Sequence, residues 1–217
     1  MGFDVTFHPV SPRDLQYFVF DVFADPSLAP SRAAELTDDP AKQAFVSEGI
    51  YGRFASWTTE RPLRFAGTIA FACAAVAGFR HPYWYAGGLA LSFLGDTLGV
   101  APRFTPLPRL ARGPVHQLTD ESEGLIRHNY SASGLLEPAQ LVAVVSQLQS
   151  LEDRPADAVG FALADCEGRQ ALERAVGYAR RHELGLIEAA DLVVPFAGQS
   201  STDIDHLRGR FVGRLEP

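Results

Sequence analysis

Two apolar runs joined by a short aromatic segment constrain the fold of this chain more than any other feature. The first run, Phe65–Phe79, has Thr68 as its only polar side chain, and the second run, Ala86–Val100, contains Asp96. A fifteen-residue helix spans roughly 22 Å, whereas a membrane span needs about 20 apolar residues. Both runs are too short to cross a membrane. The sequence therefore predicts a central buried helical hairpin over residues 65–100, folded back on itself at Pro82.

The first of these runs is rich in alanine and glycine, which let neighbouring backbones approach closely. Its small residues are Ala66, Gly67, Ala70, Ala72, Ala74, Ala75, Ala77 and Gly78. Each glycine costs about 1 kcal/mol of helix propensity relative to alanine, so tertiary packing must stabilise the segment. We expect this helix to lie in the middle of the fold.

Periodicity and capping residues predict the other elements. Ser11 followed by Pro12 is typical of a helix start, and apolar residues recur at helical spacing from Leu141 to Leu151. The expected helices cover 11–24, 41–57, 64–79, 87–99, 138–151 and 166–183, with Gly185 ending the last. The expected strands cover 3–7, ended by His8 and Pro9, and short segments at 125–130 and 159–163. The predicted fold class is helix-dominated α+β with a few short strands.

Length and composition favour one compact domain over residues 1–217. Hydrophobic residues make up 47% of the chain and charged residues 21%, which suffices to bury a core. A proline-rich connection at 101–114 allows a subdivision into 1–100 and 115–217, although proline makes such a connection stiff and extended.

The charge is uneven along the chain. The net charge is −7, and residues 111–217 hold 10 basic and 16 acidic side chains. This excess of acidic groups disfavours nucleic acid and an anionic membrane as partners and suits a basic protein partner. The N-terminus has no basic and apolar leader, and two cysteines do not make a disulfide framework. We therefore expect a cytoplasmic protein.

Motifs that would identify an enzyme are missing from the sequence. The chain has no P-loop, no dinucleotide-binding glycine pattern, no C-x-x-C and no nucleophile elbow. His182 and Glu183 begin an H-E-x-x-H pattern, but Leu186 stands where the second histidine would be. The sequence thus identifies no metal-ligand set and leaves any cofactor unknown.

Two clusters are candidates for a ligand site. The first combines His8 with the turn that holds His81, Tyr83 and Trp84, where imidazoles could transfer protons and aromatic rings could form the walls of a pocket. The alternative is that these rings close the core at a helix–helix turn. If the first strand packs beside the hairpin, these residues share one cleft.

The second cluster is the segment from His128 through Ser131 to Gly134. Serine and glycine before a helix N-terminus can supply backbone donors to an anion; equally, they are the ordinary residues of a turn and a helix cap. We expect His128 and Ser131 to join the cleft formed by the first cluster.

The sequence supports two functions from different classes. The leading one is a protein-binding or regulatory protein without catalysis, comparable to a neutralising or immunity protein. The alternative is a small hydrolase or transferase that uses His8, His81 or His128 as a general base, with or without a metal ion. Whether the protein is an enzyme stays open at this level, as do its ligand and oligomeric state.

Overall fold

The computed structural model describes residues 5–56, 62–87, 90–91, 104–112, 115–116, 133–151, 166–190 and 201–202. Within these ranges the fold is helix-dominated α+β. Six strands form one sheet in the order β3-β4-β5-β1-β2-β6, with every pairing antiparallel. The strands are β1 Val5–Val10, β2 Tyr83–Tyr85, β3 Thr105–Pro106, β4 Ser133–Leu136, β5 Gly185–Ala190 and β6 Ser201–Thr202.

The helical segments lie mainly between β1 and β2, and again before β5. The first group comprises α1 Pro12–Leu15, α2 Asp21–Ala24, α3 Ala29–Leu36, α4 Pro40–Ala44 and the long α5 Pro62–Arg80. Two π-helical segments, Gln16–Phe20 and Phe45–Ile50, and the 3₁₀ segments Pro26–Leu28 and Tyr51–Ser56 complete this group. A further 3₁₀ segment, Leu107–Leu110, follows β3, and the later helices are α8 Pro138–Leu151 and α10 Cys166–Arg181.

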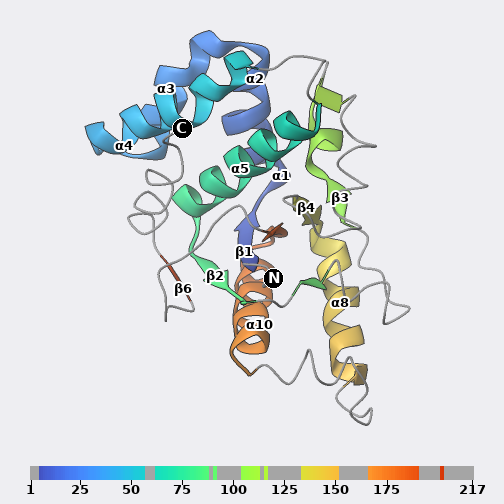
Figure 1. Ribbon diagram of the computed structural model, residues 1–217. Coiled ribbons are helices and arrows are strands. Elements are labelled where there is room, and N and C mark those ends of the chain that lie inside the picture. Colours follow the sequence, from blue (N-terminus) through green and yellow to red (C-terminus); the bar gives the residue numbers. More distant parts are fainter. Residues whose placement is uncertain are drawn as a thin grey trace.

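Helices cover both faces of the sheet. Figure 1 shows α1 to α5 in the upper part of the molecule and α8 and α10 in the lower part, with the strands between them. Side chains alternate between the faces along each strand. Leu135, Ile187 and Tyr83 join the core around α5, whereas Phe7, Leu136 and Leu186 join the core around α8 and α10. The sheet thus separates two hydrophobic cores.

Five of the six predicted helices, 11–24, 41–57, 64–79, 138–151 and 166–183, coincide with helical segments to within a few residues at their ends. The start of the sixth, 87–99, is not helical, because Gly87 lies in a turn with a φ of 56°. Ser11 caps α1 by accepting a hydrogen bond from the Asp14 backbone at 2.9 Å, and α8 has the predicted bounds. The central helix α5 is buried from Ile69 to Ala77. Of the described helices, none is long and apolar enough to cross a membrane.

The hairpin prediction is wrong at its turn. Tyr83–Tyr85 is strand β2 and pairs with β1, with Thr6 opposite Tyr85 and Phe7 opposite Trp84. Three consecutive aromatic residues are compatible with a strand or a turn, and the pairing with β1 shows that here they form a strand. Most of the second expected helix, 87–99, lies outside the described residues, as do the expected strands at 125–130 and 159–163.

Two element ends also differ from the prediction. Strand β1 continues through Pro9 to Val10, which is possible because β2 pairs only with Thr6 and Phe7, so Pro9 is paired on one side alone. The turn that follows α10 takes its left-handed φ, 55°, at Glu183 and not at Gly185. Gly185 instead opens β5, where a Cβ would lie 2.8 Å from the Leu136 carbonyl oxygen.

The proline-rich connection is packed against the sheet. Strand β3 lies within it and pairs with β4, so that Thr105 faces Leu135. Leu107, which follows directly, is fully buried in the core around α5. Strands from both parts of the chain therefore form one sheet.

Candidate functional site

Strand β2 distributes its aromatic side chains to opposite faces of the sheet. Tyr83 points toward α5 and is fully buried, whereas Trp84 points toward α10 and stays partly exposed. This follows from the two-residue period of a strand and from the cross-strand partner of Trp84, Phe7, which lies in the core around α8 and α10. The aromatic triplet therefore contributes to two different environments.

The α5 face holds a sealed polar cluster. His8 stacks on Tyr83 with ring centroids 4.5 Å apart and an interplanar angle of 11°. Its Nε2 lies 2.8 Å from Thr6 Oγ1, and that hydroxyl donates to the Ala189 carbonyl at 3.4 Å. Nδ1 is buried and has no hydrogen-bond partner among the described residues.

Burial controls the chemistry of this cluster. Removal from water lowers the pKa of His8 to about 3, because the charged imidazolium loses its hydration without gaining a partner. His8 is 0% exposed, so no substrate reaches it in this conformation. Its burial and its low basicity disfavour His8 as a general base, because a base with so low a pKa accepts a proton weakly.

The α10 face carries a row of aromatic rings. Tyr178 of α10 lies at its centre, with ring centroids 5.6 Å from Trp84, 5.9 Å from His81 and 4.3 Å from His182. The His81 Nδ1 lies 3.3 Å from the Tyr178 hydroxyl. Burial lowers the pKa of His81, with Asp14 opposing that shift and Arg80 and His182 adding to it. Trp84 thus contacts Tyr178, which is itself packed against two histidine rings.

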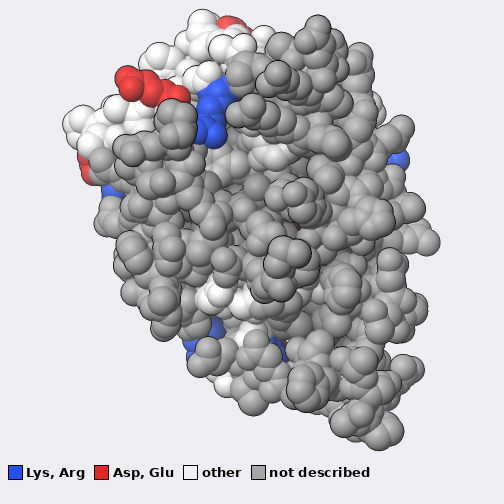
Figure 2. Space-filling model, viewed as in Figure 1, with Lys and Arg blue, Asp and Glu red and all other residues white. Residues whose placement is uncertain are grey.

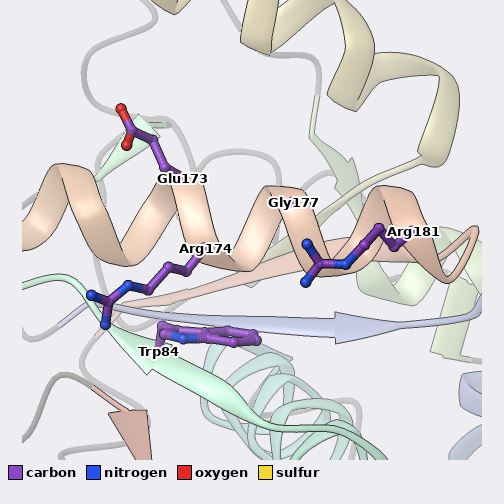
Figure 3. A pocket seen from close by; sticks show the side chains of 5 residues that line it. All are labelled: Trp84, Glu173, Arg174, Gly177 and Arg181. Atoms are coloured by element: carbon purple, nitrogen blue, oxygen red, sulfur yellow. The ribbon is translucent and has the colours of Figure 1, made fainter.

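A hollow of about 390 Å³ opens between the Trp84 indole and α10. It is lined by Trp84, Glu173, Arg174, Gly177 and Arg181. Figure 3 shows the indole edge-on beneath the helix, with Arg174 reaching toward one end of the ring and Arg181 turned to the same side of the helix. Arg174, Gly177 and Arg181 are three and four residues apart, the spacing that places side chains on one helix face.

Positive charge dominates this hollow. Glu173 points away from the indole (Figure 3) and accepts a hydrogen bond of 2.9 Å from Arg169. Within the part of the chain that the structure describes, Arg174 and Arg181 form no ion pair with a protein side chain. Helix α10 as a whole holds four arginines and two glutamates, although it belongs to the acidic half of the chain.

Gly177 opens the space between the two arginines. A Cβ at this position would meet only the Arg181 side chain, at 4.0 Å, so packing does not require glycine. Glycine inside a helix costs about 1 kcal/mol relative to alanine. The missing methyl group leaves the centre of the hollow open at the expense of helix stability.

The structure brings the expected site residues together only in part. His8 and Tyr83 stack on the α5 face, and His81 and Trp84 both contact Tyr178 on the α10 side, so these four do not share one cleft. His128 and Ser131 lie outside the described residues. Of the downstream segment, Ser133 and Gly134 belong to β4 where a loop was expected. That any of the six binds a ligand stays a prediction.

Sequence reasoning did not identify Arg174, Gly177 and Arg181 as site residues. By sequence alone, Arg181 is only a favourable charge near a helix end. The available signal was a glycine between two arginines on one helix face, but nothing in the sequence pairs that face with Trp84. Among the described residues, no group of three or more histidine, cysteine or acidic side chains could hold a metal ion.

Comparisons with families of known proteins, with curated proteins and with solved structures find no match to this chain.

Proposed function

We propose that this protein is a cytoplasmic binding protein without catalysis, and that it holds an anionic ligand in the hollow between Trp84 and α10. The observation that carries the proposal is the pair of arginines, Arg174 and Arg181, which flank an indole across Gly177 and form no ion pair among the described residues. Arginine side chains suit carboxylate and phosphate groups because the planar guanidinium can donate two parallel hydrogen bonds.

We expect the basic protein partner, which the overall charge favours, to bind a surface other than the hollow beside Trp84. Figure 2 shows acidic atoms at the upper left, over α3 and α4, with basic atoms beside them, and further basic atoms lower down, in the region of α10. Residues 5–56 hold seven acidic and four basic side chains. A basic partner remains a proposal for that region, whereas the hollow favours an anion.

Catalysis through His81 is the second candidate. Its Nε2 is buried and has no hydrogen-bond partner among the described residues, while Nδ1 faces the Tyr178 hydroxyl. An imidazole oriented by a tyrosine could accept a proton from a substrate. Binding is preferred because the hollow holds two cationic side chains, and none of the described residues that line it is a nucleophile.

The proposal is tested by ligand-induced stabilisation with simple anions. We expect inorganic phosphate, citrate or ribose 5-phosphate to raise the Tm of the wild-type protein, and the rise to weaken with added salt. The double variant Arg174→Glu/Arg181→Glu should lose the effect. Arg180→Glu is the matched control, because Arg180 is exposed on the same helix but does not line the hollow. An equal loss in the control, or no response in the wild type, contradicts the proposal.

A further inference from the structure

We infer that the ligand is a small molecule in which a planar aromatic or heteroaromatic ring carries a phosphate or carboxylate group. This inference rests on the proposed function and adds the ligand class. It combines two features of the same hollow: an indole face that can accept a flat ring, and two guanidinium groups that can hold an anion.

The orientation of Trp84 supports the stacking half of the inference. Tyr178 contacts the indole at 5.6 Å with a tilt of 52°, and the Tyr178 ring is itself packed against His81 and His182. An indole packed against Tyr178 loses less conformational freedom when a ligand binds than a free side chain does, which favours affinity. Trp84 is also partly exposed and lines the hollow, so part of its ring is accessible there.

The arginines support the anionic half. Arg174 and Arg181 are seven residues apart, about two helical turns, with Gly177 between them. A ring lying over the indole would therefore meet a guanidinium near either end of the hollow. The volume of about 390 Å³ suits a small molecule. The carboxylate that lines the hollow, Glu173, is bonded to Arg169 and points away from the indole.

The experiment uses matched pairs of probes in a Trp57→Phe background, where Trp84 is the sole tryptophan. AMP is compared with adenosine, which lacks the charge, and with ribose 5-phosphate, which lacks the ring. Nicotinate is compared with nicotinamide. Binding is followed by Trp84 fluorescence and by calorimetry. We expect AMP or nicotinate to quench the fluorescence of Trp84 and to bind at least tenfold more tightly than its uncharged partner. Whichever of the two binds more tightly shows whether the anion is a phosphate or a carboxylate.

Variants separate this inference from the proposed function. In the wild-type background, Trp84→Leu should weaken AMP binding by about five- to a hundredfold, the range for loss of one stacked base, and leave ribose 5-phosphate unchanged. If ribose 5-phosphate binds as tightly as AMP and Trp84→Leu affects neither, the ring inference is wrong while anion binding stands. If no anion binds, or if Arg174→Glu/Arg181→Glu binds like Arg180→Glu, the proposed function fails and the inference with it.

Discussion

Tyr83 and Trp84 are neighbours in one strand but lie in opposite environments. Tyr83 is sealed between the sheet and α5, stacked on a neutral histidine. Trp84 faces a hollow with two arginines and remains partly exposed. The difference shows that an aromatic side chain next to a histidine does not by itself indicate a binding site. The face of the sheet that α5 seals contributes to stability, whereas the face toward α10 leaves space in which a ligand can bind.

Truncation of the two rings should give the largest contrast. Tyr83→Ala removes a fully buried ring and should lower the free energy of unfolding by about 3–5 kcal/mol. Trp84→Ala should cost clearly less, because its ring is partly exposed. Urea denaturation of both variants measures the difference, with Tyr83→Phe as the control that keeps the ring. Equal losses would show that the two faces are not distinct.

Low pH should reduce the free energy of unfolding through His8, which lies on the face of the sheet that α5 seals. Burial lowers the pKa of its imidazole from the ordinary value of 6.5 to about 3 in the folded protein. The unfolded chain therefore binds a proton first, so stability contributed by neutral His8 is present above pH 6.5 and is lost as the pH falls toward 3. A fully buried group with these values loses about 3 kcal/mol between about pH 7 and pH 4.

His8→Gln isolates this contribution, because glutamine does not titrate. Unfolding free energies measured from about pH 7 to pH 4 should fall less steeply in the variant than in the wild type. Burial also lowers the pKa of His81, so His81 adds to the acid sensitivity of the wild type and of the variant. Its contribution is the same in both and cancels when the two curves are compared. Parallel curves would mean that the pKa of His8 is the same in the folded and unfolded states, which would contradict its burial.

Overpacking of α5 should have the next largest effect. Ala75 is 0% exposed in the core on the sealed face, so Ala75→Leu should cost about 1–3 kcal/mol. The matched control is Ala143→Leu, since Ala143 is exposed on α8. Thermal unfolding distinguishes the two variants, and an unchanged Tm for Ala75→Leu would place this side of α5 in contact with solvent.

The smallest expected change in stability is a gain, and it concerns the face of the sheet that α10 covers. Gly177→Ala should raise stability by about 0.5–1 kcal/mol, because alanine favours the helix and its Cβ meets nothing closer than 4.0 Å. The added methyl group should also weaken anion binding in the hollow. Gly185→Ala is the control: its Cβ would lie 2.8 Å from a carbonyl oxygen, so it should destabilise. A destabilised Gly177→Ala would contradict a role for glycine in keeping the hollow open.

The helices of this protein follow from its sequence because their causes are local. Ser11 caps α1, an unbroken apolar run makes α5, and a regular stripe makes α8. The helix-dominated α+β class is therefore recoverable without tertiary information. Local patterns also marked His81 and Trp84 as residues of interest, although they could not say which face of the fold each would occupy.

Only the tertiary structure decided what those residues meet. The pairing of β2 with β1, and of β1 with β5, joins segments far apart in the chain, and no local rule specifies such partners. Because of this strand pairing, the aromatic segment that was expected to be a turn is a strand, and Tyr83 and Trp84 lie on opposite faces of the sheet. The contact between His81 and Tyr178 spans 97 residues. Arg174, Gly177 and Arg181 reach Trp84 in the same way, because packing of α10 on the sheet, and not sequence proximity, forms the hollow.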